Sequence, residues 1–141
     1  MQGITLDVTV HDIDDLDSLG WPGVADAHAW DMHAFQCREF IAIWNETIGV
    51  SRRAEPKLVV VRRGGQPAMF LPLCVETHVG TRVLRFMDGG VADFNAPILA
   101  RGAAPRAEEM VGLIARVART IGRVDAIDFP HMPVNIEANA N

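Results

Sequence analysis

The stretch KLVVVRRGGQPAMFLPLCV, residues 57–75, decides the fold of this chain. Its first part, residues 57–62, is a short run rich in β-branched side chains, and its second part, residues 67–75, is largely apolar. Between them stand Arg63-Gly64-Gly65-Gln66, and glycine readily adopts the positive φ angles that tight hairpin turns need. The pattern predicts two antiparallel strands joined by a tight turn. Because Pro72 has no N–H to donate, we expect a bulge or a sheet edge at that position.

Other segments have the alternation or the short apolar run that is typical of strands. A turn at His78-Val79-Gly80 leads from the hairpin into the next of these segments, so residues 57–87 are expected to form an antiparallel meander. The segments are residues 3–10, 81–87, 96–100 and 125–129.

Two segments have the apolar spacing of helices. Residues 25–49 carry large apolar side chains at intervals near three and four, and Gly49 suits a helix end. After a loop at residues 50–56 and the strands, residues 105–121 form a second amphipathic pattern, with Pro105 as the first helical residue. We expect this second helix to pack on a face of the meander. The element order predicts the α/β class, with a mixed, largely antiparallel sheet and helices on its faces.

Length and composition indicate one soluble globular domain. The chain has 141 residues, of which 49% are hydrophobic and 22% are charged, and its net charge is −5. That charge argues against a nucleic-acid partner that is bound through its phosphates. No apolar stretch approaches the roughly 20 residues that span a bilayer, and the first residues do not resemble a signal peptide. We therefore expect a cytoplasmic protein without membrane insertion.

Familiar catalytic motifs are missing from the sequence. There is no HExxH pair, and His28 and His33 are five residues apart, so no metal site is expected. Neither a GxSxG elbow nor a phosphate-binding glycine loop is present. Cys37 and Cys74 lack CxxC spacing and lie in apolar surroundings, which predicts two buried free thiols.

The candidate substrate-binding residues follow the strand at residues 81–87. Polar groups in loops at strand ends can face a cleft, and glycines there let a ligand approach the backbone. The alternative is an ordinary turn at residues 88–90, with the later polar side chains capping local backbone. The candidates are Asp88, Gly89, Gly90, Asp93 and Asn95.

Six segments together resemble a known family. They are Phe35-Gln36 with Trp44, Lys57–Arg62 with Gly65, Leu71-Pro72-Leu73, Arg82–Gly90, Asp93-Phe94-Asn95-Ala96-Pro97 and Asp125–Pro130. In order and spacing, these segments resemble the CelD/BcsL-like acetyltransferases of the GNAT superfamily, which are named for cellulose-biosynthesis members. The resemblance covers about residues 30–133. It implies a single GNAT-like domain at residues 1–133 that corresponds to the N-terminal half of a two-lobed acyltransferase, followed by a tail at residues 134–141.

The resemblance implies acyl-CoA-dependent N-acyl transfer, in a setting such as polysaccharide biosynthesis, with this half contributing to the site of a small-molecule acceptor. Acetyl-CoA or another acyl-CoA is the cofactor of the complete family fold. GNAT domains bind its pyrophosphate with a [QR]xxGx[GA] loop, and this chain has Ala104 and Arg106 at the last two required positions. We therefore expect the chain alone to bind no cofactor and to be inactive, with a C-terminal half or a second copy as partner. The alternative is a catalytically silent GNAT-like structural or interaction domain.

Overall fold

The computed structural model describes residues 5–88, 90, 95–102, 105–130 and 132. Within this part of the chain, one seven-stranded sheet runs in the spatial order β1 (Leu6–His11), β3 (Glu55–Arg63), β4 (Gln66–His78), β5 (Thr81–Phe86) and β7 (Ala126–Ile127). In addition, β6 (Ile98–Ala100) pairs with β4, and β2 (Trp30–Asp31) pairs with β6. Only β5 and β7 run parallel among the described pairs. The predicted α/β class with a largely antiparallel sheet is confirmed.

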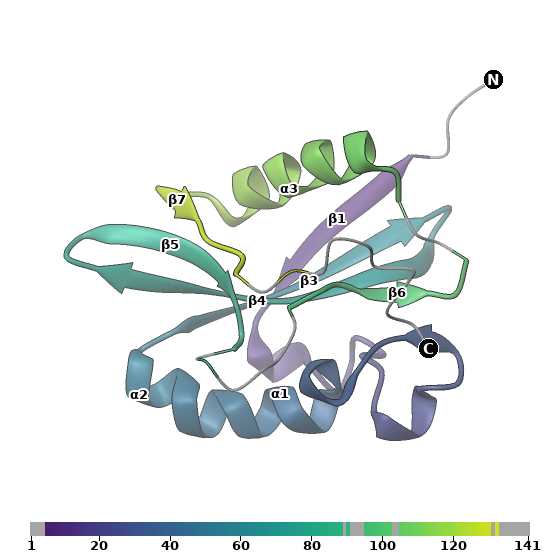
Figure 1. The fold of residues 1–141 in the computed structure, drawn as a ribbon, viewed down its shortest axis with the longest axis horizontal. Coiled ribbons are helices and arrows are strands. Elements are labelled where there is room, and N and C mark those ends of the chain that lie inside the picture. Colours follow the sequence, from purple (N-terminus) through teal and green to yellow (C-terminus); the bar gives the residue numbers. More distant parts are fainter. Residues whose placement is uncertain (1–4, 89, 91–94, 103–104, 131, 133–141) are drawn as a thin grey trace.

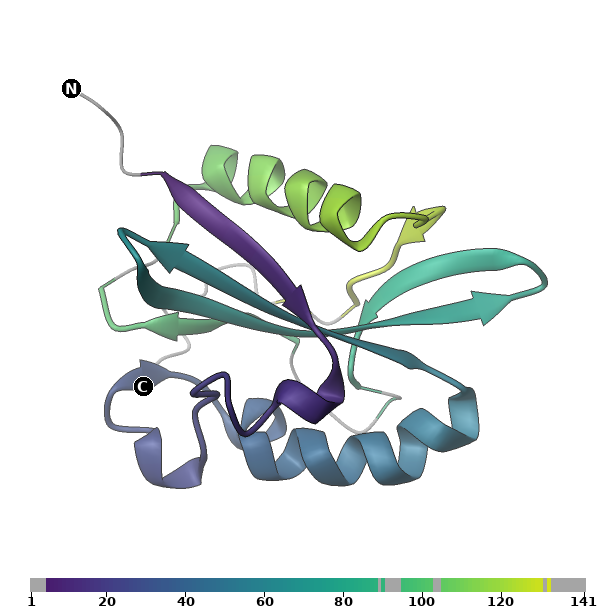
Figure 2. The same ribbon diagram turned by 180° about the vertical axis from the view of Figure 1, so that it is seen from behind.

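Helices cover both faces of this sheet (Figure 1). On one face lies α3 (Ala107–Ile121), and on the other lies a continuous helix made of α1 (Arg38–Trp44), the π-helical η4 (Asn45–Gly49) and α2 (Val50–Arg52). The view from behind shows the same layers, with β1 running beneath α3 (Figure 2). The described residues also contain the short 3-10 turns η1 (Ile13–Asp15), η2 (Val24–Asp26) and η3 (Ala34–Gln36).

The β3–β4–β5 meander forms as the sequence predicts. Gly64 and Gly65 have φ angles of 58° and 80°, which are the positive angles of a tight hairpin turn. The bulge, however, does not lie at Pro72: Val61 pairs with Met69 whereas Arg62 pairs with Pro67, so the extra residue lies between these two β4 positions.

Pro72 marks instead the point where β4 changes its neighbour. On the same side of β4, residues 69–70 pair with β6 and residues 73–78 pair with β5. The Pro72 carbonyl accepts a hydrogen bond from the Met87 nitrogen at 2.9 Å, just beyond the end of β5. Because proline cannot return a second bond, the β4–β5 ladder ends there.

The alternation of β4 divides its side chains between two cores, because successive residues of a strand point to opposite faces. Leu71 and Leu73 belong to the core that contains Leu113 and Val117 of α3. On the other face, Phe70 and Cys74 of β4 pack together with buried side chains of α1 in a second core. The buried members of this second core are Leu16, Trp21, Ile41, Trp44, Leu58, Val60, Phe70, Cys74, Met87 and Ile98. The expectation that the second helix packs on the meander is confirmed.

The prediction of one helix over residues 25–49 is wrong for its first half. The helix begins at Arg38, and the residues before it form short turns and the strand β2. Tertiary contacts hold these turns: Trp21 Nε1 donates to the Gln36 carbonyl at 2.9 Å, and the Gln36 amide donates to the carbonyl of Ala96. Trp30 packs edge-on against Phe70 with ring centroids 5.1 Å apart. The apolar spacing therefore reflects contacts with the sheet rather than one helical face.

Two other boundaries also differ from the sequence prediction. The helix continues through the expected loop as far as Arg52, and β3 already begins at Glu55. The second helix begins at Ala107, two residues after Pro105, with Arg106 as its N-cap. Among the described residues, no helix combines the length and the apolar character needed to cross a bilayer.

Candidate functional site

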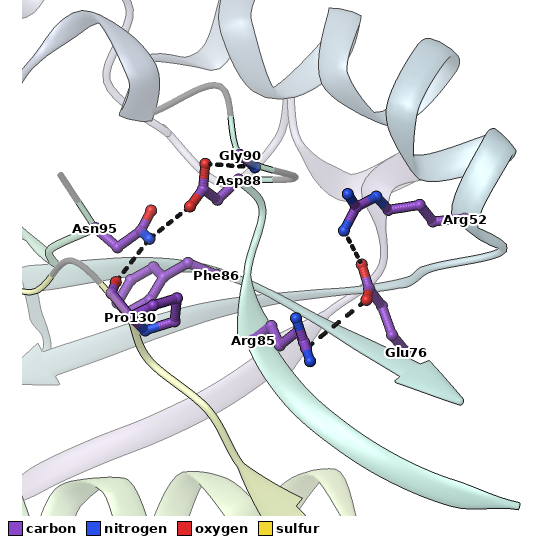
Figure 3. A pocket seen from close by; sticks show the side chains of 8 residues that line it. All are labelled: Arg52, Glu76, Arg85, Phe86, Asp88, Gly90, Asn95 and Pro130. Carbon is purple, nitrogen blue, oxygen red and sulfur yellow. Dashed lines mark hydrogen bonds and ion pairs between the residues drawn. The ribbon is translucent and has the colours of Figure 1, made fainter. Parts of the chain in front are cut away.

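A small polar cavity of about 240 Å³ opens beside the end of β5 (Figure 3). Its volume lies between the roughly 150 Å³ of an engineered cavity that binds benzene and the roughly 300–1,000 Å³ of pockets for drug-sized ligands. A ligand of a few heavy atoms would therefore fill it. The cavity is lined by Arg52, Glu76, Arg85, Phe86, Asp88, Gly90, Asn95 and Pro130.

One side of the cavity is made by three of the five residues that the sequence predicts. Asp88 is 6% exposed, and its carboxylate accepts hydrogen bonds from the Gly90 nitrogen at 3.1 Å and from Asn95 Nδ2 at 2.8 Å. The Asn95 amide also donates to the Pro130 carbonyl at 2.9 Å. Asn95 thus ties the turn after β5 to the chain that follows β7.

The remaining predicted residues, Gly89 and Asp93, lie outside the described residues. The alternative interpretation of this loop, a turn with local caps, also has some structural support. The Asp88 carboxylate caps the Gly90 nitrogen two residues on, and Gly90 has a φ of 83°. The same Asp88 nevertheless lines the cavity, so the turn and the cavity wall are one structure.

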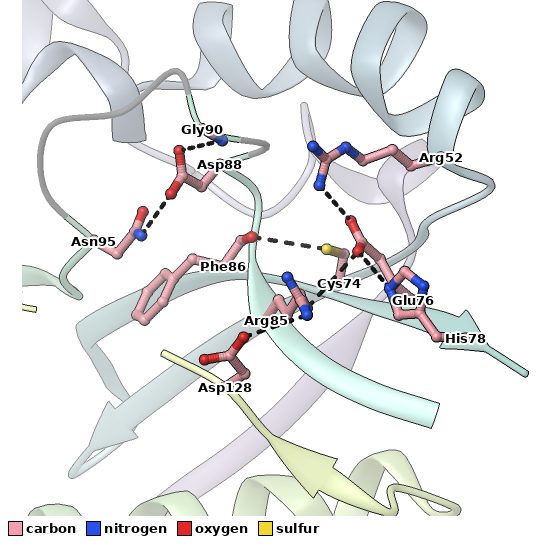
Figure 4. Close-up of polar contacts among 10 residues, drawn as sticks. All are labelled: Arg52, Cys74, Glu76, His78, Arg85, Phe86, Asp88, Gly90, Asn95 and Asp128. Carbon is pink, nitrogen blue, oxygen red and sulfur yellow. Dashed lines mark hydrogen bonds and ion pairs between the residues drawn. The ribbon is translucent and has the colours of Figure 1, made fainter. Parts of the chain in front are cut away.

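The opposite side of the cavity is an ionic cluster that the sequence reasoning missed (Figure 4). At its centre is the Glu76 carboxylate, which is only 3% exposed. Arg52 Nη1 lies 3.6 Å from Glu76 Oε1, and Arg85 Nε lies 3.7 Å from Glu76 Oε2. His78 Nε2 is 3.2 Å from the same Oε2. Arg85 also reaches the half-exposed Asp128, at 3.3 Å through Nη2.

Three elements bring this ionic cluster together. Glu76 and His78 belong to β4, in register with Cys74 on the face that packs against α1. Arg85 of β5 pairs with Cys74, which places its side chain on the same face as Glu76. Arg52 comes from the last residue of α2. A charged residue in period-two register with a buried apolar face is the one sequence signal that could have drawn attention to Glu76.

The π-helical segment η4 immediately precedes the arginine-bearing end of α2. An added Cβ at Gly49 would lie 3.1 Å from the Trp44 ring, so this wide turn packs closely against the indole. π-bulges inside α-helices are frequent at functional sites, and they change the angular position of every residue that follows. The residues that follow this π-helical segment include Arg52, which faces Glu76.

The two cysteines are not candidates for a nucleophile. Both are free and buried, as the sequence predicts. Burial raises the pKa of the Cys74 thiol to about 12, with the nearby Glu76 adding to the effect, and burial also raises the pKa of Cys37. A thiol must ionise to attack, so neither side chain is activated at neutral pH.

Two further kinds of site can be assessed in the described part of the chain. No group of three or more His, Cys, Asp or Glu side chains is arranged there to hold a metal ion. At the start of α3, the Glu109 carboxylate accepts a hydrogen bond from the Arg106 nitrogen at 3.0 Å. Glu108 and Glu109 both lie in the first turn, where their charge opposes the binding of an anion.

Comparison with known proteins identifies no relative of this chain. No protein-family model matches the chain, no curated protein matches it, and no solved structure matches it.

Proposed function

We propose that this chain is the acceptor-binding half of a GNAT-type, acyl-CoA-dependent N-acyltransferase, in a setting such as polysaccharide biosynthesis. The observation that carries the proposal is the cavity that Asp88, Gly90 and Asn95 share with Arg52, Glu76 and Arg85. The mixed sheet with helices on both faces is compatible with the fold that the resemblance to CelD/BcsL-like acetyltransferases implies.

The chemistry of the cavity suits an amine acceptor. An amine is bound as ammonium by carboxylates, and it must lose a proton before it can attack an acyl thioester. The buried Asp88 carboxylate lines the cavity, so it can bind the ammonium group and receive its proton. The hydrogen bonds from Gly90 and Asn95 orient the Asp88 carboxylate for this role.

In this proposal the acyl-CoA is bound by another polypeptide segment. The start of α3, which follows the Arg101–Arg106 segment, is occupied by its own Glu109 carboxylate and carries two acidic side chains in its first turn. A pyrophosphate group would meet like charge there. The complete enzyme then needs a C-terminal half or a second copy of the chain to supply the cofactor.

Nuclear magnetic resonance titration of the full chain tests this function. Butylamine is expected to shift the amide resonances of Glu76, Arg85 and Gly90, whereas acetyl-CoA is expected to shift none at similar concentrations. Micromolar binding of acetyl-CoA, which corresponds to about −8 kcal/mol, would show that the cofactor assignment is wrong. Butylamine that leaves the cavity resonances unmoved would overturn the acceptor assignment.

A second candidate function is a catalytically silent interaction domain. The observation that favours it is the edge of the sheet at β7, where Ala126 and Ile127 are exposed. An open strand edge can pair with another chain. If the chain binds a partner through β7 and no amine enters the cavity, this second function is the better account.

A further inference from the structure

We propose that the cavity recognises a small zwitterion, a molecule that carries a primary amine at one end and a carboxylate at the other. This inference rests on the proposed function, because it names the class of acceptor for the same cavity. It follows from the placement of two arginines around Glu76 on one side of the cavity and of Asp88 on the other, as Figure 3 shows.

The cationic side is formed by Arg52 and Arg85. Glu76 lies between them, at 3.6 Å from one and 3.7 Å from the other, so one buried carboxylate holds two guanidinium groups in place. Arg85 also lies 3.3 Å from the half-exposed Asp128 through Nη2, and an exposed ion pair of this kind contributes little. The Arg52 and Arg85 side chains line the cavity and are 42% and 32% exposed, and guanidinium groups bind carboxylates well.

The acidic side is formed by Asp88 and the carbonyl of Pro130. Asp88 accepts hydrogen bonds from the Gly90 nitrogen and the Asn95 amide. These two bonds orient the carboxylate. A ligand ammonium that reached this side would find a carboxylate and a carbonyl oxygen as acceptors, which are the partners an ammonium group needs.

The wall between the two sides is apolar. Phe86 and Pro130 both line the cavity, and the close-up places them between Asn95 and the arginines. A short chain of methylene groups can lie against such a wall while its two charged ends reach opposite sides. The volume of about 240 Å³ limits this chain to a few carbon atoms.

The test is a titration of the isotope-labelled full chain with ω-amino acids of increasing length: glycine, 3-aminopropanoate, 4-aminobutanoate and 5-aminopentanoate. Butylamine and butanoate serve as singly charged controls that match 4-aminobutanoate in size. We expect affinity to peak at one length, and the best zwitterion to bind at least tenfold more tightly than either control. The shifted resonances should belong to both sides of the cavity.

Two substitutions separate the charged ends. Asp88→Asn should reduce binding of the zwitterion to the level of butanoate, and Arg52→Gln should reduce it to the level of butylamine. Arg53→Gln and Asp14→Asn are the matched controls, because both residues are exposed and neither lines the cavity. These two control variants should bind as the unmodified chain does. An overlaid resonance spectrum checks that each variant is folded.

The outcomes distinguish this inference from the function on which it rests. If butylamine binds as tightly as every zwitterion, the proposed specificity for zwitterions is wrong, whereas the proposed amine-acceptor site is retained. Butanoate that binds while no amine does would overturn both. Zwitterions that bind equally well at all lengths would refute the division of charge across the cavity. These comparisons use the unmodified chain, so they hold even if a variant fails to fold.

Discussion

Replacing Asn95 with alanine removes the side chain that joins the turn after β5 to the segment after β7. Asn95 is 4% exposed, and its amide donates to Asp88 Oδ2 at 2.8 Å and to the Pro130 carbonyl at 2.9 Å. A hydrogen bond to a charged group contributes about 1.5–3 kcal/mol and a neutral one about 0.5–1.5 kcal/mol. We expect Asn95→Ala to lower the free energy of unfolding by about 2–4 kcal/mol, which is close to the sum of these two contributions. The loss is not larger because water in the cavity can solvate Asp88 once the Asn95 amide is gone.

Urea unfolding followed by circular dichroism measures this change. The slope of free energy against urea should stay constant, because the variant exposes the same surface on unfolding, while the midpoint falls. For a chain of this length each kcal/mol lowers the melting temperature by about 2–4 °C, so the thermal midpoint should fall by roughly 4–16 °C. A loss below about 0.5 kcal/mol would refute the reasoning, because it is the size expected for a surface substitution.

Asn95→Asp is the matched variant, since it keeps the shape of the side chain and changes only its chemistry. It places a second carboxyl group against Asp88 and against a carbonyl oxygen. Two carboxylates this close repel each other unless they share a proton. The variant should therefore be least stable at neutral pH, and its deficit relative to the unmodified chain should shrink as the pH falls. A deficit that stays constant with pH would contradict the proposed contact.

Four other predictions concern glycine packing, the thiol, an ion pair and the sheet edge. Gly49→Ala should destabilise the chain by about 1–2 kcal/mol because its Cβ meets a buried indole ring at 3.1 Å, whereas Gly112→Ala, with nothing within 4 Å, should stabilise it by about 1 kcal/mol; equal effects in urea unfolding would rule out this packing argument. Cys74, with its pKa raised to about 12, should react with an aromatic disulfide reagent only after unfolding, and rapid labelling of the native chain would show that it is not buried. The bidentate hydrogen bonds from Arg82 lower the pKa of Glu55, so the stabilisation that they give is present above the ordinary carboxyl pKa of 4.5 and is lost as the pH falls. The difference in stability between the unmodified chain and Glu55→Gln should therefore disappear in acid. A difference that grows in acid would contradict this ion pair. Ile127, 44% exposed on the edge strand β7, should mediate self-association, which light scattering over a dilution series would detect and Ile127→Lys would weaken; a chain that stays monomeric at high concentration would disprove it.

The candidate site could be predicted from the sequence only on its loop side. Asp88, Gly90 and Asn95 stand within eight residues of one another, and glycine beside short polar side chains after a strand is a local pattern. The sequence offers no comparable sign for Arg52, Glu76 and Arg85, which lie on three different elements. They meet because the register of β4 against β5 and the end of α2 place them on one face.

The helix over residues 25–49 shows how a periodic pattern can mislead. Apolar residues at intervals of three and four predict one buried helical face, yet Trp30 lies in the strand β2 and packs on Phe70. Trp21 and Gln36 hold the intervening turns through hydrogen bonds that join residues 15 and 60 positions apart. These partners are distant in the chain, so a local window contains no information about them.

The sequence by itself determined the β3–β4–β5 meander and α3, because turn glycines, alternating side chains and an amphipathic helical face act between residues that are near neighbours in the chain. Only the tertiary structure decided that β4 changes its neighbour at Pro72, that β7 lies parallel to β5 at the sheet edge, and that a buried glutamate joins two arginines beside the predicted loop. The physical reason is that strand order, register and the burial of charge depend on contacts between segments that are far apart in the chain, and the energy of each contact exists only once the others have formed.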